Sequence, residues 1–358
     1  MNDTILKTAE RGDVLGREEI KGLLSLSDPS DLSRLFAAAR DARAACFGSS
    51  IFLYGFLYFS THCRNNCRFC QYRRANTALE RYRKSLPEIV SAAREMAKTG
   101  VHLIDLTMGE DPEFYRTGFH PLINLVRAVR RETGLPVMIS PGVVPDGVVK
   151  DLAGTGAEWL ACYQETHNRT RYAELRTGQD YDLRMASKKT AAREGMLVEE
   201  GLLTGVGERL DDLADSIICM RDLPADQVRV MTFVPQSGTP MADTPTVSRL
   251  LERKVIAVMR LVMPDRLIPA SLDVDGLDGL KDRLEAGANV VTSIVPPAAG
   301  LAGVANNALD IEDSRRSVDR VTEILAACGL RVAPHSQYRD WIGQRRTAKQ
   351  TPVAAGAA

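Results

Sequence analysis

Three closely spaced cysteines offer the clearest chemistry in this chain. Cys63, Cys67 and Cys70 form a C-x3-C-x2-C pattern, whereas the other four of the seven cysteines are scattered. The cluster directly follows the apolar run Ile51–Phe59, which predicts a buried strand. Three thiolates this close can hold one metal centre and leave a metal position open to an outside ligand.

Zinc is one alternative for this loop. A structural zinc site usually takes four ligands from two C-x2-C pairs, and only one such pair is present. His62 is adjacent to Cys63, which is awkward for a shared tetrahedral site. An iron–sulfur cube accepts three thiolates, and its open iron can bind the amino and carboxylate groups of S-adenosyl-L-methionine (SAM). With Phe69 before the last cysteine, the spacing is typical of the radical SAM superfamily.

Alternating strands and helices must position this loop. The predicted strands are Ile51–Phe59, His102–Met108, Pro136–Ser140, Glu158–Tyr163, Leu197–Thr204, Gln227–Phe233, Arg266–Leu272 and Asn289–Ile294. The predicted helices are Pro87–Lys98, Pro121–Glu132, Asp146–Ala153, Asp182–Glu194, Leu210–Arg221, Val247–Met263, Gly276–Glu285 and Ser314–Ala327. This α/β pattern predicts a (β/α)8 barrel of the TIM type, with an open doubly wound sheet as the alternative. The cysteine loop would then lie at the barrel's C-terminal end, where sites of this fold are built.

The chain divides into three expected parts. Residues 1–50 predict an N-terminal helical cap, residues 51–342 the barrel, and residues 343–358 a flexible tail. The N-terminal helices and the segment VPPAAGLAGVANN, after the last strand, are candidates for sealing the two ends of the barrel. Sealing would matter for reactive fragments, which must not meet water.

Composition excludes several classes of partner. Forty-six basic and forty-six acidic residues balance, so no global charge favours nucleic acid or a membrane surface. The longest apolar run has nine residues, too few to span a bilayer, and the charged start MNDTILKTAERGD lacks a secretory signal. Seven cysteines are too few for a disulfide framework, which favours a reducing, cytoplasmic location.

Four polar residues interrupt strands that a barrel would bury on both faces. They are Asp105 in HLIDLTM, Arg229 in QVRVMTF, and Ser271 and Asp273, which share parity in IPASLDVDG. Each could instead point outward or cap a strand end, and Asp273 could cap the following helix. Facing the lumen, they would suit a diamino acid, because arginine binds an α-carboxylate and aspartate binds an ammonium group.

A second polar group follows the predicted strand ends. Gly109 and Glu110 come after the second strand, Glu165 comes after the fourth, and Arg176 lies shortly beyond. A glycine lets backbone approach a ligand closely. Glu165 and Arg176 are candidates for binding the ammonium or ribose and the carboxylate of SAM. The alternative is a surface ion pair worth roughly 0–1 kcal/mol.

Several segments resemble the methylornithine synthase family of pyrrolysine biosynthesis, within the radical SAM superfamily. They include FLYFSTHCRNNCRFCQYRR, LIDLTMGEDPEFY, YQETHNRTRYAELRTGQDYDLR, VRVMTFVPQSGTP and RLIPASLDVDGLDGL. The resemblance runs from about residue 20 to about residue 342. It implies a closed (β/α)8 barrel and a mutase that converts L-lysine to (3R)-3-methyl-D-ornithine. The implied route is hydrogen abstraction by a 5′-deoxyadenosyl radical, fragmentation of the carbon skeleton and recombination.

The resemblance also implies roles for individual residues. The ligands of a 4Fe–4S cluster would be Cys63, Cys67 and Cys70, which together form the radical-generating site. Residues that fall on SAM-binding positions are Phe69, Glu110, Glu165 and Arg176. Residues that fall on the amino acid pocket are Asp105, Arg229, Ser271 and Asp273. The implied partners are L-lysine and a reducing protein such as a flavodoxin or ferredoxin.

Two other functions remain open from the residues alone. A sulfur-inserting enzyme, similar to biotin synthase or to the hydrogenase-cofactor maturase, would need a second cluster, and of the remaining cysteines only Cys162 lies on a predicted strand. A cluster-carrying electron-transfer protein would need no amino acid pocket, so the buried charges in the strands argue against it.

Overall fold

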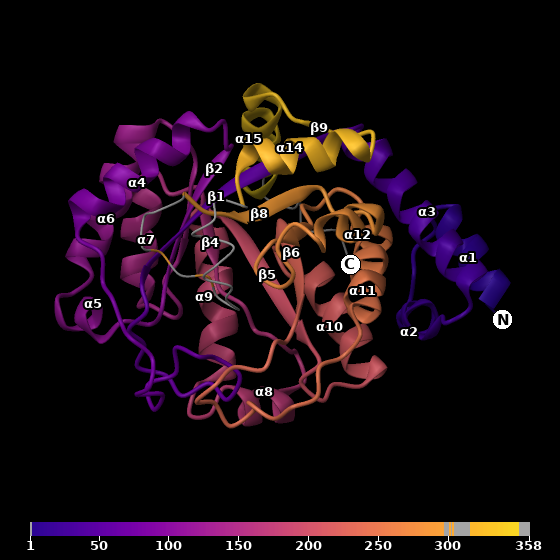
Figure 1. The fold of residues 1–358 in the computed structure, drawn as a ribbon, viewed down its shortest axis with the longest axis horizontal. Helices are drawn as coiled ribbons and strands as arrows, with labels where there is room; N and C mark the ends of the chain where they lie inside the picture. Colours follow the sequence, from indigo (N-terminus) through magenta and orange to yellow (C-terminus); the bar gives the residue numbers. More distant parts are fainter. Residues whose placement is uncertain (1, 297–300, 302, 304–315, 351–358) are drawn as a thin grey trace, which may run out of the picture.

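The computed structural model describes residues 2–296, 301, 303 and 316–350. Parallel strands curve into a nearly closed barrel that is surrounded by helices (Figure 1). The strands are β1 (Ser50–Ser60), β2 (Leu103–Met108), β3 (Val137–Ser140), β4 (Trp159–Ala161), β5 (Leu197–Thr204), β6 (Gln227–Thr232), β7 (Pro269–Ser271), β8 (Val290–Ile294) and β9 (Arg331–Val332). Their order is β6-β5-β4-β3-β2-β1-β8-β7, and β9 pairs with β1. The predicted (β/α)8 fold is confirmed, and the eight predicted strands are found, β5 with the predicted ends and the others with shifted ends.

The barrel closes between β6 and β7 at the start of these strands. Gln227 makes a parallel bridge with Leu267, which directly precedes β7. The backbone N–H of Val228 donates to the Leu267 carbonyl at 2.9 Å, and the Leu267 N–H donates to the Asp226 carbonyl at 3.0 Å. The C-terminal halves of β6 and β7 are therefore free to direct side chains into the space between them.

Helices follow the strands as the sequence predicts. They are α4 (Leu86–Lys98), α5 (Pro112–Arg116), α6 (His120–Thr133), α7 (Asp146–Gly154), α8 (Arg169–Leu175), α9 (Tyr181–Arg193), α10 (Leu210–Asp222), α11 (Arg249–Val262), α12 (Leu280–Glu285) and α14 (Val318–Ala327). Two short turns of helix, α5 and α8, were not predicted. Side-chain caps fix both starts: Asp111 accepts from the N–H of Glu113, and Asn168 accepts from the N–H of Arg171.

The N-terminal helices lie along the flank of the barrel and not across its end (Figure 1). They are α1 (Asn2–Glu10), α2 (Arg17–Ser25) and α3 (Pro29–Phe47). α2 packs against α10 and α11, α3 packs against α11, and α1 packs on α2 and α3. Arg17 pairs with Asp215 at 2.6 Å, and Lys21 pairs with Asp211 at 2.9 Å. The extension is helical as predicted, but its position does not match the sealing role expected of it.

The N-terminal end of the barrel is instead closed by the last helix, α15 (His335–Gln350) (Figure 1). Tyr338 and Ile342 of this helix join a buried apolar cluster with Phe52, Tyr54 and Trp159 from the strands. Residues 343–350 continue α15 where the sequence predicted a flexible tail, and Lys349 forms an ion pair with Asp226. Residues 351–358, and most of the segment VPPAAGLAGVANN, lie outside the described residues.

No helix of the described residues is long and apolar enough to cross a bilayer.

Candidate active site

The cysteine loop leaves the end of β1 at the C-terminal end of the barrel. Cys67 is buried, Cys63 and Cys70 are half-buried, and all three are free thiols. A Cβ at Gly109 would lie 2.2 Å from the carbonyl oxygen of His62, so only glycine allows the loop to pass this close to the end of β2. The sequence suggested Gly109 for a close approach to a ligand, whereas the structure shows it making room for the cysteine loop.

The donor set of this loop fits an iron–sulfur cluster. Burial raises the pKa of the Cys70 and Cys63 thiols, and their neighbouring sulfurs raise it further, so a metal centre is needed to stabilise the thiolates. Among the residues that the structure describes, no three His, Cys, Asp or Glu side chains form a group suited to one metal ion. Three thiolates from one loop are a donor set that an iron–sulfur cluster takes, whereas a structural zinc site usually takes four ligands.

The predicted pair Glu165 and Arg176 lies beside the loop. Nη2 of Arg176 donates to Oε1 of Glu165 at 2.7 Å and to the carbonyl of Tyr163 at 3.0 Å. Nη1 lies 3.7 Å from the Sγ of Cys67, and the guanidinium lies 5.4 Å from the ring centre of Phe69. Two predicted cofactor-binding residues, Phe69 and Glu165, line the same cavity as Cys70.

Glu165 has an unusual backbone conformation. Its φ is +68°, which is strained for a residue with a Cβ. Two hydrogen bonds to β5 hold it: its N–H donates to the carbonyl of Gly201 and its carbonyl accepts from Leu203, both at 3.0 Å. Burial raises the pKa of the Glu165 carboxyl, and Arg176 opposes that shift. Strain of this kind is common where a side chain must face a ligand.

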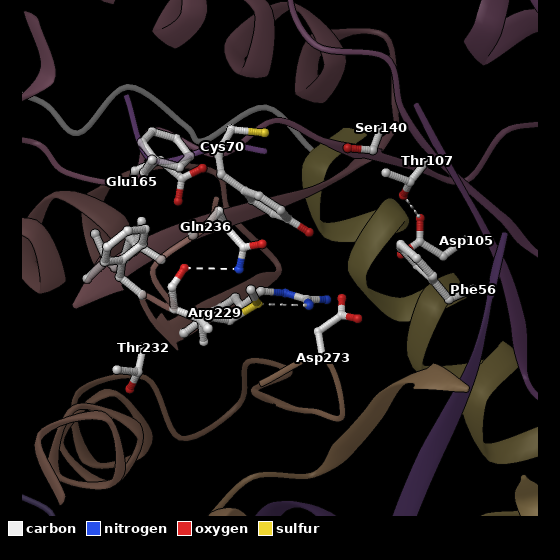
Figure 2. Close-up of a pocket in the computed structure, with 18 residues that line it drawn as sticks. Phe56, Cys70, Asp105, Thr107, Ser140, Glu165, Arg229, Thr232, Gln236 and Asp273 are labelled. Atoms are coloured by element: carbon white, nitrogen blue, oxygen red, sulfur yellow. Dashed lines mark hydrogen bonds between the residues drawn. The ribbon is translucent and has the colours of Figure 1, made fainter. Parts of the chain in front are cut away.

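One cavity of about 100 Å³ joins the cysteine loop to the barrel lumen (Figure 2). A space of this size suits a small molecule. Figure 2 shows Cys70 and Glu165 on one side of the cavity, with Asp105 and Thr107 on the opposite side. Strand register explains this grouping, because Phe56 pairs with Asp105, and Thr107 pairs with Ser140, and all four line the cavity.

Asp105 is a buried carboxylate with little compensation. Thr107 donates to its Oδ1 at 3.0 Å, and no described cation forms an ion pair with it. Burial raises the pKa of Asp105 to about 7, with Glu199 adding to the shift and Arg229 opposing it. The negative charge of Asp105 is therefore only partly compensated by described residues, and a bound ammonium group would stabilise it.

Arg229 does not stand alone in the lumen. Its Nε donates to Oε1 of Glu199 at 2.7 Å, and Oε2 of Glu199 accepts from the hydroxyl of Tyr163 at 2.7 Å. Nη2 of Arg229 is buried and forms no hydrogen bond with any described residue. Burial alone would lower the pKa of Arg229, but Glu199 raises it above its ordinary value. The guanidinium is thus permanently charged and has an edge free for an anionic ligand.

Asp273 lines the cavity, whereas Ser271 lies beneath it. Oδ1 of Asp273 accepts from Arg316 at 2.8 Å, and Oδ2 accepts from Ser293 at 3.1 Å. Ser271 is buried, and its hydroxyl accepts from the backbone N–H of Asp273 at 3.3 Å. The shared parity of these two residues brings them to one side, but Ser271 supports the backbone of Asp273 and does not line the described cavity.

Glu110 is not among the residues that line the cavity. Its carboxylate pairs with Arg184 at 2.7 Å and with Arg64 at 3.2 Å, and it accepts from the N–H of Val143 at 3.2 Å. These contacts tie the cysteine loop to the loops after β2 and β3. The cofactor contact expected of Glu110 stays a prediction.

Three site residues were missed in the sequence. Glu199 lies within LVEEGLLT, so the rule that singled out Asp105, a charge inside a strand, could have found it. Gln179 lies in the turn between α8 and α9, and Arg316 lies beyond the last barrel strand. Nothing in the local sequence of either residue indicates a place in the site. Their importance comes from contacts between segments far apart in the chain.

The profile of the Radical SAM superfamily matches residues 57–217, which span the cysteine loop and the strands β2 to β5. The fold is thus that of the radical SAM enzymes, and the three thiols at the end of β1 lie within the matched segment.

Relatives that match most of the chain identify its family within the radical SAM superfamily. A 3-methylornithine synthase from Methanosarcina barkeri is 43% identical over 325 residues, which cover 91% of this chain and 92% of that protein. A crystal structure of methylornithine synthase (PylB) superposes with a TM-score of 0.89 at 42% identity, and covers 94% of this chain and 99% of that one. This chain belongs to the 3-methylornithine synthase family.

A more distant relative is the hydrogenase maturase subunit HydE of Thermotoga maritima. It is 29% identical over 290 residues, which cover 80% of this chain and 82% of that protein. Membership of the radical SAM superfamily implies SAM and an iron–sulfur cluster as cofactors. The alternative of a non-enzymatic electron carrier is therefore excluded.

Proposed function

We propose that this protein is a lysine mutase that converts L-lysine to (3R)-3-methyl-D-ornithine, the first step of pyrrolysine biosynthesis. The proposal rests on family membership and on one observation, that two charged groups of the buried cavity lack a full set of partners. Asp105 forms no ion pair with any described residue, and Nη2 of Arg229 forms no hydrogen bond with any described residue. A diamino acid offers an ammonium group to Asp105 and a carboxylate to Arg229.

Each charged group has a natural partner on a diamino acid. The free edge of Arg229 would bind the α-carboxylate, because a guanidinium pairs with a carboxylate through parallel hydrogen bonds. Asp105, which forms no ion pair with a described residue, would bind one ammonium group. Asp273 keeps Arg316 as a partner and would accept from the other ammonium group. Ser271 would support Asp273.

The residues at the mouth of the cavity would hold the cofactors. Cys63, Cys67 and Cys70 would be the protein ligands of a 4Fe–4S cluster. Glu165 and Arg176, with Phe69, would orient SAM beside Cys70. When bound, the cluster and SAM supply a 5′-deoxyadenosyl radical after reduction by a donor such as a flavodoxin or ferredoxin. A reducing cytoplasm would keep these thiols available.

The floor of the cavity supports a reaction that fragments its substrate. Below Asp105 and Glu199, the lumen is filled by apolar side chains such as Tyr54, Leu103 and Leu197. Two fragments of a carbon skeleton held here could not pass through the floor, and water could not reach them from below. Confinement keeps the fragments together and makes recombination effectively intramolecular.

The test is anaerobic incubation of the reconstituted protein with L-lysine, SAM and a reductant. Substrate and product are isomers, so chromatographic retention must accompany mass analysis. We expect 5′-deoxyadenosine and a new amino acid with the mass of lysine and the retention of authentic 3-methylornithine. A reaction without SAM is the control. Cleavage of SAM that leaves lysine unchanged, while another amino acid is rearranged, would reject lysine as the substrate.

A further inference from the structure

Gln179 is a side chain near the cysteine loop to which none of the roles above assigns a task. It lies in the turn between α8 and α9, after Gly178, whose φ of +75° shapes the turn. Its carbonyl Oε1 accepts from Nη2 of Arg184 at 2.8 Å and from Nη1 of Arg176 at 3.4 Å. Two guanidiniums therefore share one amide oxygen.

This arrangement fixes the orientation of the amide. A flipped side chain would turn its NH2 group towards two guanidiniums, which only donate hydrogen bonds. The NH2 group must therefore point away from the arginines, and Nε2 lies 3.0 Å from the Sγ of Cys67. An N–H···S contact at this distance is a direct hydrogen bond to a thiol that the family assigns to the cluster.

The two arginines are themselves held in place. Arg184 is buried and pairs with Glu110 at 2.7 Å, and its Nη1 lies 3.3 Å from the Sγ of Cys162. Arg176 is buried and pairs with Glu165 at 2.7 Å. The amide of Gln179 is thus preorganised by two ion pairs, and its donor does not have to be ordered when the cluster is reduced.

We propose that Gln179 donates a hydrogen bond to the Cys67 thiolate of the bound cluster and thereby raises the cluster's reduction potential. Reduction adds negative charge to the cluster and its sulfurs, and a donor aimed at a sulfur stabilises the reduced state more than the oxidised state. Gln179 is a positioning and tuning residue that touches the ligand and not the substrate. The inference needs the cluster of the family but not lysine as the substrate.

The test is a redox titration of the reconstituted holoprotein, monitored by electron paramagnetic resonance without lysine. Gln179→Leu removes the donor at similar size, and Gln179→Glu keeps an acceptor for both arginines but replaces the donor with a charged oxygen. We expect Gln179→Leu to reduce the equilibrium constant for reduction about tenfold, which is about 59 mV for one electron. Gln179→Glu should lower the potential further.

Thr177→Ala is the matched control, because Thr177 lies in the same turn, is exposed, and its hydroxyl donates to the Glu174 carbonyl at 3.3 Å. Its potential and iron content should equal those of the wild type. A wild-type potential in Gln179→Leu with full iron content would overturn the proposal, as would a potential above wild type in Gln179→Glu. Loss of iron from both variants would assign the side chain to cluster assembly and would also overturn it.

Discussion

The two ends of the barrel are stabilised in different ways. At the C-terminal end, buried charges gather around a small cavity, among them Asp105, Arg229 and Glu199, and Glu165 has a strained backbone. At the N-terminal end, aromatic side chains fill the lumen. Trp159 stacks on Trp341 with ring centres 5.9 Å apart and planes 7° apart.

This difference separates stability from function. Burying charges and holding a strained residue cost free energy that only a ligand or a partner side chain offsets. Dry aromatic packing contributes stability and needs no ligand. Substitutions at the C-terminal end should therefore change turnover, and substitutions at the floor should change the free energy of unfolding. The following predictions test that separation.

Arg229→Ala should have the largest effect on turnover. It removes the group proposed to bind the α-carboxylate and leaves Glu199 as a buried, unpaired charge, a cost of about 3–5 kcal/mol for such pairs. We expect lysine turnover to fall by at least about a hundredfold. The visible absorbance of the cluster should persist, because Arg229 does not contact the cysteines. Turnover similar to that of the wild type would refute the assigned carboxylate contact.

Glu199→Gln should have a smaller effect on the same contact. The amide oxygen can still accept from Nε of Arg229, but the negative charge that orients the guanidinium is gone. We expect KM for lysine to rise about tenfold, or about 1.4 kcal/mol, with a smaller change in kcat. The matched variant is Glu200→Gln, because Glu200 is the next residue in β5 and pairs with Lys188 outside the lumen.

Glu200→Gln should lower the midpoint of thermal unfolding, since it leaves the buried ammonium of Lys188 without its ion-pair partner. KM for lysine should stay unchanged. Equal changes of KM in both variants would show that the two faces of β5 are coupled. The assignment of Glu199 to positioning Arg229 would then fail.

The same contrast explains what could be predicted from the sequence. The eight strands follow from apolar runs, and the cysteine loop follows from spacing, because both are local patterns. Asp105 and Arg229 stand out as charges in buried strands, but their partners do not. Arg316 reaches Asp273 across more than forty residues, and Gln179 reaches Cys67 from a different turn.

The N-terminal end of the barrel, which α15 closes, was harder still to predict. The sequence of α15 is polar and was assigned in part to a tail, yet Tyr338, Trp341 and Ile342 close the barrel. These few apolar residues close the barrel only because α15 lies across its N-terminal end, a position that the local sequence does not indicate. Contacts between distant segments, and not local preference, decide this end of the molecule.

The pH dependence of substrate binding offers a moderate test of the C-terminal end. The pKa of Asp105 is raised to about 7, so its carboxyl takes up a proton as the pH falls through 7 and loses the charge that would bind an ammonium group. KM for lysine should therefore rise severalfold between about pH 8 and about pH 6. Asp105→Asn should show a high KM that no longer varies over this range. An unchanged pH profile in Asp105→Asn would assign the titration to another group.

Tyr338→Phe should have the smallest effect on catalysis. The hydroxyl of Tyr338 donates to that of Tyr54 at 2.7 Å, and its loss leaves a buried hydroxyl without that partner, at a cost of about 1–3 kcal/mol. Denaturant unfolding should show this loss, whereas kcat and KM should equal those of the wild type. The control is Tyr181→Phe, because the hydroxyl of Tyr181 donates a longer hydrogen bond, of 3.4 Å, to the His167 carbonyl. A raised KM in Tyr338→Phe would mean that the floor helps to shape the cavity, and stability and function could then no longer be assigned to opposite ends of the barrel.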